Sequence, residues 1–286
     1  RIKLTIDNTK IDSTLSNFPV TVFFTSTQAE EIFTEFDADS DYMKCAFTSS
    51  DGTTQLYAEK ELFDINKSYY PPAYSDTYVK STTKYSTSYW AYYAIDPAKL
   101  LTGSWTINSW LSASGDNTNQ RFHIDLGSAK VIKRIYYENG HDSGTTTNSG
   151  VQNFTFWGSN TGAGTFDDLV YANDEGWTQL TTSQSTFDEH SEADEADPKY
   201  ITVTNNTAYR YYAFKFADNY GNNFYMGVRR IELQMPEAIY PDKLPSISSS
   251  ADTDIYYYYD NDHADNTTYI GAIFSMFVYM VIDWTS

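Results

Sequence analysis

Apolar and polar residues alternate, or apolar residues run together over short lengths, throughout the first quarter of this chain. Such runs occupy residues 1–6, 18–24, 44–50 and 54–63. Because successive side chains of a β-strand point to opposite faces, a period of two over these lengths predicts strands. Asp51-Gly52 lies between the third and fourth runs and predicts a hairpin turn.

Helical periodicity is nearly absent from the sequence. The best candidate is the short segment 28–36, which has acidic residues in its first turn. No long amphipathic pattern occurs elsewhere. The sequence therefore predicts an all-β fold with short helical turns.

The middle of the chain repeats the strand pattern, with polar loops between the runs. Seven runs are expected to form strands: 119–127, 131–139, 151–160, 176–182, 199–205, 209–218 and 226–235. Short strands of this number and spacing are typical of a β-sandwich of the jelly-roll type.

Prolines divide the chain into segments. Pro71 and Pro72 stand before the central strands, and three further prolines follow them between residues 236 and 245. Proline ends strands and stiffens linkers, so these positions indicate boundaries. We expect a central sandwich over 73–236, a second small β-sandwich domain split between 1–72 and 237–271, and the start of a further domain or a tail over 272–286.

Residues 269–286, "YIGAIFSMFVYMVIDWTS", form the most apolar part of the chain. Their unbroken apolar stretch is shorter than the ~18–20 residues that a membrane-spanning helix needs. We expect a buried pair of strands here and no membrane insertion, with a membrane anchor as the alternative.

Composition narrows the class of partner. The 286 residues include 26 Tyr and carry a formal net charge of −19. Tyr suits strands and also surfaces that contact sugars or proteins. Nucleic acids and anionic membranes need a cationic surface, so the charge argues against both as partners. The acidity also has a simpler interpretation, since it keeps a Tyr-rich surface soluble.

Cysteine and histidine are scarce. Cys45 is the only cysteine, which excludes a disulfide framework and a cysteine-based zinc site. It lies in a run with strand alternation, so we expect a core residue, with a nucleophile as the alternative. The four histidines are not paired at metal-ligand spacing.

The order of motifs over residues 85–235 resembles discoidin-like domains, which are also called coagulation-factor C-type or galactose-binding-like domains. The matching residues are Ala94, Asp96, Trp110, Phe122, Asp125, Leu126, Gly127, Ile132 and Ile135, followed by "FTFWGSN", "GWTQL", "YRYYAFKF" and "RRIELQ". This variant is most similar to copies in bacteriophage tail and appendage proteins. It lacks the cysteine pair of the animal members.

The two flanking segments resemble a second β-rich domain, found in phage structural proteins and bacterial surface proteins. The resemblance rests on "RIKLTIDNTKIDSTLSNFPVTV", "TSSDGTTQLYAEKELFD" and "LPSISSSADTDIYYYYDNDHADNTTYIG". In that family these pieces run close together. The resemblance therefore implies that the discoidin-like module is inserted between them.

Two polar loops are candidate ligand sites, because discoidin-like domains usually bind ligands at loops at one end of the sandwich. A shallow sugar site needs an aromatic face and polar groups. Loop 139–150 offers His141 and Asp142, and loop 217–227 offers Asn219, Tyr220, Asn222, Asn223, Phe224 and Tyr225. Arg210 is a further candidate. The alternative is that these side chains only stabilise their own loops and that Arg210 pairs with an acid.

The same resemblance implies a possible structural Ca²⁺. Many sugar-binding relatives hold the ion between the Ala-x-Asp turn and a Glu near the last strand, and Asp96 and Glu232 occupy those positions. Carboxylates with loop carbonyls are suitable Ca²⁺ ligands. The acidic runs 37–41 and 260–265 complete no Ca²⁺ loop and are expected to be solvated turns.

No nucleophile elbow, phosphate loop or zinc-protease motif is present in the sequence. We therefore expect a non-enzymatic extracellular protein on a virion or cell surface, such as a phage tail, fibre or capsid appendage. Its discoidin-like module would bind a surface glycan or host-cell receptor, and the protein would form homo-oligomers or contact other subunits. The alternatives are a purely structural fibre or shell subunit, and a non-catalytic module of a larger secreted glycan-degrading enzyme.

Overall fold

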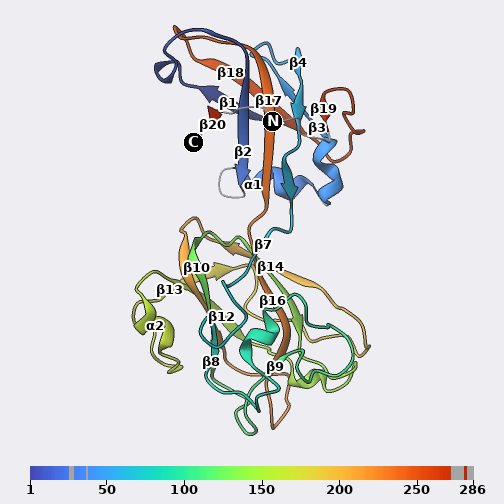
Figure 1. The fold of residues 1–286 in the computed structure, drawn as a ribbon. Coiled ribbons are helices and arrows are strands. Elements are labelled where there is room, and N and C mark those ends of the chain that lie inside the picture. Colours follow the sequence, from blue (N-terminus) through green and yellow to red (C-terminus); the bar gives the residue numbers. More distant parts are fainter. Residues whose placement is uncertain (26–28, 37, 272–279, 282–286) are drawn as a thin grey trace. The chain divides into compact units, whose positions relative to one another are not determined.

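The computed structural model describes residues 1–25, 29–36, 38–271 and 280–281. The chain divides into two compact units: unit 1 comprises Arg1–Lys67 and Met235–Ser286, and unit 2 comprises Ser68–Gln234 (Figure 1). Strands dominate both units, so the prediction of an all-β fold is confirmed.

Helical elements are short throughout the described residues. They are η1 (Asn8–Lys10), α1 (Glu30–Glu35), η2 (Asp39–Met43), η3 (Ala91–Ala94), η4 (Thr147–Ser149) and α2 (Ala163–Asp167). None of the helices in this part of the chain has the length and apolar character needed to cross a lipid bilayer.

Unit 1 contains two sheets. The first has the strand order β1-β18-β3-β4, and the second has the order β19-β5-β17-β2-β20, with β6 also paired to β17. The bounds are β1 Ile2–Ile6, β2 Leu15–Thr25, β3 Cys45–Thr48, β4 Gln55–Leu56, β5 Ala58–Glu59, β6 Leu62–Asp64, β17 Glu237–Ile247, β18 Thr253–Tyr259, β19 Ile270–Gly271 and β20 Met280–Val281.

Aromatic side chains join the inner faces of these two sheets. Phe24 of β2 lies 4.6 Å from Tyr257 of β18, measured between ring centroids, and Phe47 of β3 lies 5.6 Å from Tyr240 of β17. All four side chains are buried in one hydrophobic cluster. Each pair takes one ring from each sheet, so unit 1 is a small sandwich. Cys45 belongs to the same cluster, as expected for a core residue.

The run 54–63 is divided between the two sheets. Leu56 of β4 pairs with Phe47 in the first sheet, whereas Ala58 of β5 pairs with Asp242 in the second. The chain therefore crosses from one sheet to the other at Tyr57. The hairpin turn predicted at Asp51-Gly52 is present, with Gly52 in the left-handed region at φ 72°.

The C-terminal segment is described only in part. Residues 272–279 and 282–286 lie outside the described residues, so the expected further domain or tail stays a prediction. Met280 and Val281 form β20, which pairs in parallel with Val20 and Thr21 of β2.

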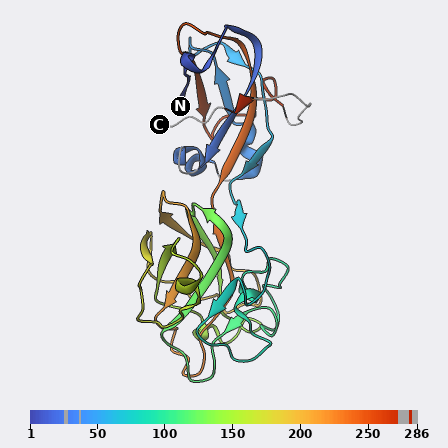
Figure 2. The ribbon, with the colours of Figure 1, turned by 60° about the vertical axis from the view of Figure 1, so that its left-hand side comes forward.

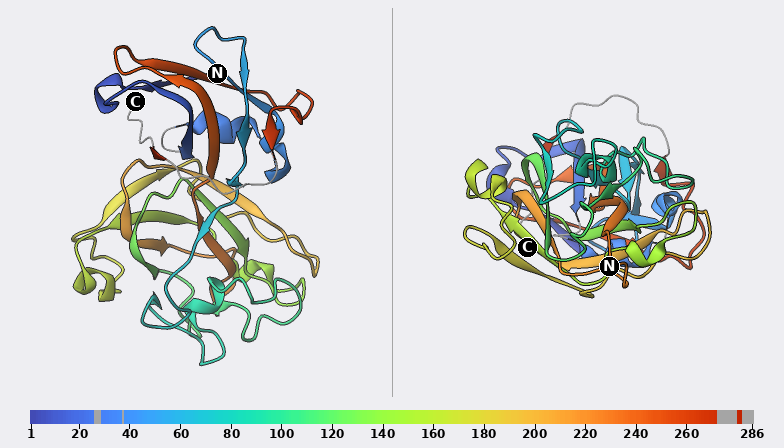
Figure 3. Two further views of the ribbon diagram at one scale, coloured as in Figure 1. Left: turned by 45° about the horizontal axis from the view of Figure 1, so that its top comes forward. Right: turned by 90° about the horizontal axis from the view of Figure 1, so that it is seen from below.

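The strands of unit 2 are hydrogen-bonded in the order β7-β16-β11-β14-β13-β12-β15-β10-β8, and β9 pairs with β16. Figure 2 and Figure 3 show unit 2 from further directions, coloured from teal through green and yellow to orange. The bounds are β7 Ser68–Tyr69, β8 Val79–Ser81, β9 Trp110–Leu111, β10 Gln120–Lys130, β11 Arg134–Asn139, β12 Phe154–Ser159, β13 Thr178–Thr182, β14 Lys199–Thr204, β15 Tyr209–Phe216 and β16 Gly227–Gln234. All seven predicted central strands are therefore present.

The sheet of unit 2 curls so that its two halves enclose one core. Phe154 of β12 and Tyr137 of β11 belong to different halves, and both pack against Phe187 from the β13–β14 connection, at centroid distances of 4.7 and 4.0 Å. Trp110 of β9 is fully buried in the same cluster. This packing of two layers on a shared core confirms the predicted β-sandwich.

Candidate functional site

The two candidate loops of unit 2 lie side by side. The backbone N–H of Asn222 donates to the carbonyl of Asn148 at 3.2 Å, and Gly150 forms a bridge with Gly227. A Cβ atom on Gly140 would lie 2.6 Å from the Gly227 carbonyl oxygen, so only glycine permits this close approach. The fold thus brings together loops 139–150 and 217–227, which are about 70 residues apart in the sequence.

His141 points into the protein rather than toward a ligand. Its side chain is fully buried and stacks on His190 at a centroid distance of 3.9 Å. Its Nε2 meets the Leu101 carbonyl at 2.9 Å, and its Nδ1 accepts from the Gly144 N–H at 3.0 Å. Both ring nitrogens are engaged, so His141 stabilises its loop and does not offer the contact that the sequence suggested.

Asp142 and Tyr220 are also used within the fold. The Asp142 carboxylate accepts from the backbone N–H of Trp105 at 3.2 Å. The Tyr220 hydroxyl donates to the Phe187 carbonyl at 2.5 Å. Each side chain is half-buried and holds a neighbouring segment in place.

Arg210 lies at the other end of β15 from loop 217–227, because it is the second residue of a strand that ends at Phe216. Its guanidinium forms a bidentate pair with the Asp125 carboxylate, at 2.8 and 2.9 Å. This is the acid pairing considered as its alternative role. The structure does not bring Arg210 to the candidate loops.

Asparagine side chains fix the conformation of loop 217–227. The Asn222 side-chain oxygen accepts from the backbone N–H groups of Phe224 and Tyr225, at 2.8 and 3.1 Å. Asn219 is buried and donates to the Asn222 carbonyl at 2.9 Å. Asn223 is exposed at the tip of the loop. The loop is therefore held from within while its tip faces solvent.

Five aromatic side chains gather beside this tip, and we call them the aromatic platform: Tyr85, Tyr89, Trp105, Phe224 and Tyr225. The centroid of Tyr85 lies 5.1 Å from that of Tyr225 and 5.5 Å from that of Tyr89. Phe224 lies 5.9 Å from Tyr225, and Trp105 lies 6.4 Å from Tyr89. The contacts form a continuous chain of rings from three separate loop segments.

The platform combines fixed and exposed rings. Tyr89 is 9% exposed and forms its base, whereas Tyr85 is 47% and Phe224 is 59% exposed. A hydrogen bond with Tyr85 raises the pKa of Tyr225. Exposed rings held by other rings can receive an apolar ligand face with little loss of side-chain entropy.

Ile107 borders the platform in a strained conformation. Its φ is 59°, in the left-handed region, which is unfavourable for a β-branched residue. Its N–H donates to the Ser88 carbonyl at 2.8 Å, and its side chain is 51% exposed. Strain of this kind occurs often at functional sites, so Ile107 is a further candidate contact residue.

Sequence reasoning selected Phe224 and Tyr225 but missed Tyr85, Tyr89 and Trp105. These three residues precede the predicted central strands, and neither candidate loop includes them. The aromatic density of "YSTSYWAYY", residues 85–93, was the available signal. The sequence alone could not show which of these rings reaches loop 217–227, because that contact depends on tertiary folding.

The two predicted calcium ligands are engaged by protein groups. Asp96 accepts from the backbone N–H of Ala98 at 2.9 Å within its own turn. The Glu232 carboxylate accepts from the Ser68 hydroxyl at 2.8 Å. Among the described residues, no group of three or more His, Cys, Asp or Glu side chains could hold a metal ion.

Arg230 connects the regions that the expected calcium ion would join. Its guanidinium donates to the Glu232 carboxylate at 3.2 Å and to the Lys99 carbonyl at 2.6 Å, and the side chain is buried. A divalent cation beside this guanidinium would meet electrostatic repulsion. The residues present therefore do not fit Ca²⁺ between the Asp96 turn and Glu232.

Two buried histidines, His123 and His141, are engaged by backbone groups. Burial lowers the pKa of His123 and of His141 to about 4, so both are neutral near pH 7. His123 contacts the Phe166 carbonyl at 2.8 Å. In the part of the chain that the structure describes, no Ser, Thr or Cys side chain donates a hydrogen bond to a histidine ring, as an activated nucleophile would.

Comparison with known proteins gives limited information. No family model matches the chain, and no curated protein matches it.

Several solved structures are similar at low identity. Chitosan-binding module 1 of a chitosanase/glucanase from Paenibacillus sp. IK-5 is 19% identical, with 55% of this chain and 92% of that chain covered and a TM-score of 0.37. The family 32 carbohydrate-binding module of NanJ from C. perfringens, in complex with galactose, is 13% identical, with 56% and 91% covered and a TM-score of 0.37. The family 32 module of EndoD from Streptococcus pneumoniae is 13% identical, with 59% and 99% covered and a TM-score of 0.40. At these TM-scores the likenesses carry no argument about what this chain binds.

Proposed function

We propose that unit 2 is a non-enzymatic glycan-binding module, and that it binds through the aromatic platform. The observation that carries the proposal is the exposure of Tyr85 and Phe224 on either side of Tyr225, beside the asparagine-rich loop tip. The C–H face of a sugar ring packs on an aromatic ring, and neighbouring amides bond its hydroxyl groups. Exposed rings with amides beside them therefore suit a sugar.

The charge of the protein supports an uncharged glycan as the ligand. The chain carries a net charge of −19, and the nearby Asp116 is exposed. An acidic surface repels sulfated or sialylated glycans at long range and has no such effect on neutral sugars. Neutral hexoses and N-acetylhexosamines are the proposed ligand class.

The proposed setting is a virion or cell-surface adhesion protein outside the cell, such as a component of a phage tail, fibre or capsid appendage. This setting rests on the resemblance in sequence and on the surface position of the platform. A non-catalytic module of a larger secreted glycan-degrading enzyme is the alternative setting. The full-length gene distinguishes the two, because the enzyme setting requires a catalytic domain in the same protein.

A glycan array probed with the full chain tests the function. We expect binding of neutral glycans, and a loss of about tenfold or more in Tyr225→Ala and in Tyr85→Ala, because each removes a ring of the platform. Tyr200→Ala is the matched control, since Tyr200 is 48% exposed on β14 outside the platform. Unchanged binding in both platform variants, with the control also unchanged, would reject this site.

Subunit contact is the second function to which an exposed aromatic surface is suited. Light scattering on the same variants separates it from glycan binding. A purely structural subunit would bind no glycan and would lose an oligomer in Tyr225→Ala. That result would replace the adhesion function with an assembly function.

A further inference from the structure

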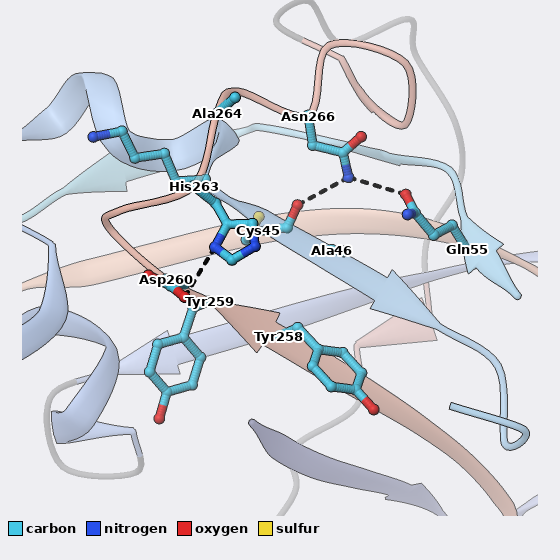
Figure 4. Close-up of a pocket in the computed structure, with 10 residues that line it drawn as sticks. Cys45, Ala46, Gln55, Tyr258, Tyr259, Asp260, His263, Ala264 and Asn266 are labelled. Carbon is cyan, nitrogen blue, oxygen red and sulfur yellow. Dashed lines mark hydrogen bonds and ion pairs between the residues drawn. The ribbon is translucent and has the colours of Figure 1, made fainter. Parts of the chain in front are cut away.

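Unit 1 contains a cavity of about 390 Å³ on the outer face of its first sheet (Figure 4). Its lining includes Lys44, Ala46, Gln55, Tyr258, His263 and Asn266. We propose that this cavity is a second binding site, and that it takes one neutral saccharide unit. The site belongs to unit 1 and does not rest on the function proposed for unit 2.

The cavity forms because a small residue, Ala46, lies beside the larger Tyr258 on this face of the sheet. Ala46 of β3 pairs with Tyr258 of β18, and both are on the face opposite the core residues Phe47 and Tyr257. The methyl group of Ala46 leaves the space beside the Tyr258 ring unfilled. A cavity of this size is within the range of small-ligand sites.

The loop after β18 closes one side of the cavity. The backbone N–H of Asn266 donates to the Met43 carbonyl at 2.8 Å, and that of Asp260 donates to the Lys44 carbonyl at 3.2 Å. The Asn266 side chain donates to the Cys45 carbonyl at 3.0 Å. These bonds fix the loop against the start of β3, so the cavity is formed before any ligand binds.

The aromatic wall is held in place. The Tyr258 hydroxyl accepts from the Arg1 guanidinium at 2.9 Å and donates to the Gly52 carbonyl at 3.3 Å. The ring is therefore anchored at its far end while it borders the cavity. A fixed ring offers a packing surface for the C–H groups of a sugar.

Two amide side chains at the rim, Gln55 and Asn266, bond to each other and together leave one donor and one acceptor for a ligand. Asn266 Nδ2 donates to Gln55 Oε1 at 3.2 Å (Figure 4). Among the described residues, Gln55 Nε2 and Asn266 Oδ1 have no further protein partner. A sugar hydroxyl both donates and accepts, so the two atoms match it.

The lysine at the rim is already paired, which favours a neutral ligand. Lys44 lies 2.9 Å from the Asp41 carboxylate, and His263 lies 2.9 Å from the Asp260 carboxylate. The loop also carries Asp262 and Asp265, so an anion would be repelled. Cys45 also lines the cavity, but its thiol belongs to the buried core, where it donates to the Tyr42 carbonyl at 3.3 Å; burial raises the pKa of the thiol to about 12, so it is not a nucleophile.

Saturation-transfer NMR on the full chain carrying Tyr225→Ala tests the site. This background lacks the central ring of the platform, so binding in unit 1 is measured separately from binding in unit 2. The probes are the methyl glycosides of glucose, galactose and N-acetylglucosamine. We expect one of them to bind with a Kd on the order of 1 mM.

Four substitutions locate the binding. Tyr258→Ala should weaken it by about tenfold or more, whereas Tyr256→Ala should leave it unchanged, because Tyr256 is on the same face outside the cavity. Tyr258→Phe should retain binding, since the ring remains. Ala46→Phe should abolish binding by filling the cavity from a half-buried position, which avoids removing the bonds of Tyr258.

No saturation transfer from any of the three glycosides would overturn the inference. Equal binding in the background and in Ala46→Phe would overturn it as well. The array experiment assigns binding to the platform only through Tyr225→Ala and Tyr85→Ala, so unchanged binding in those variants leaves this test unaffected.

Discussion

The carboxyl group of Asp242 is buried in unit 1 without a compensating partner. Asp242 is 1% exposed, and neither of its oxygens has a hydrogen-bond partner in the described part of the chain. Burial raises its pKa to about 7, and the nearest backbone donor, the N–H of Lys243, bonds to the Tyr57 carbonyl at 3.2 Å instead. The folded protein therefore holds a proton on Asp242 at pH values where the unfolded chain has lost it.

The free energy of unfolding of unit 1 should fall as the pH rises from about 4 to about 7 and then level off. The folded pKa is above the unfolded value, so stabilisation by the retained proton is lost across this window, by roughly 4 kcal/mol. Asp242→Asn should remove this contribution and raise stability at pH 8. Hydrogen exchange in β17 from pH 5 to pH 8, corrected for intrinsic rates, measures it.

Asp12→Asn is the control, because Asp12 is an exposed carboxylate of the same unit. It should leave the pH dependence as in the unsubstituted protein. A pH dependence that persists in Asp242→Asn would show that another group titrates.

His141 and Phe224 illustrate what a loop sequence leaves open. Both lie in polar loops between predicted strands, and both were reasonable contact residues. His141 is fully buried on His190, whereas Phe224 is 59% exposed. The polar side chain is buried and the apolar one is exposed. Two backbone groups hydrogen-bond to the His141 ring, whereas no neighbouring segment in the described part of the chain covers the Phe224 ring.

Strand β16 holds the loop of residues 99–103 with two consecutive arginines. Arg229 is fully buried, and its guanidinium donates to the carbonyls of Leu100, Thr102, Gly103 and His141. Burial lowers its pKa to about 10, so it stays charged near neutral pH. Loop carbonyls commonly bind a structural metal ion. Here the guanidinium of Arg229 takes the place that such an ion would have.

Replacing Arg229 should destabilise unit 2. Arg229→Met removes the guanidinium donor from four carbonyls, of which that of Gly103 keeps the Ser143 N–H, and should lower the free energy of unfolding by at least about 3 kcal/mol. Lys133→Met removes a single side-chain bond, to Asn206, and should cost about 1 kcal/mol or less. Chemical denaturation followed by tryptophan fluorescence measures both.

Removal of metal ions should not change the stability of the protein. Arg230 already links the Lys99 loop to Glu232, so EDTA should leave the Tm of unit 2 unchanged. Differential scanning calorimetry with EDTA and with added Ca²⁺ checks this expectation. A Tm that rises with Ca²⁺ and falls with EDTA would instead support the calcium site suggested by the sequence resemblance.

The sequence of unit 1 is interrupted once, by the whole of unit 2. The backbone N–H of Met235 donates to the Lys67 carbonyl at 2.9 Å, so the chain leaves unit 1 and returns to it at adjoining residues. The hydrophobic clusters formed by the described residues each lie within one unit. Each unit therefore has the core that a domain needs to fold alone.

Unit 1 should fold without unit 2. Replacing residues 68–234 by an Asn-Gly turn between Lys67 and Met235 spans the short gap and should give a folded protein. Circular dichroism and a cooperative thermal transition test the fold. An unfolded product, obtained while unit 2 alone folds, would show that unit 1 depends on its partner unit.

Local sequence determined the strand content, the positions of the loops and the burial of Cys45. Alternation with a period of two is a property of adjacent residues, so the central strands could be predicted. Turn chemistry is equally local, which explains the success at Asp51-Gly52.

Tertiary structure alone decided which side chains meet. Tyr85 and Tyr225 are 140 positions apart in the chain but 5.1 Å apart in space, and Arg230 donates to Glu232 where the sequence suggested a metal ion. The cavity beside Ala46 depends on the loop after β18, whose residue Asn266 hydrogen-bonds to Met43 before β3. These contacts join distant segments, and their partners are chosen by packing and by competition for buried polar groups, neither of which is encoded in any single stretch of sequence.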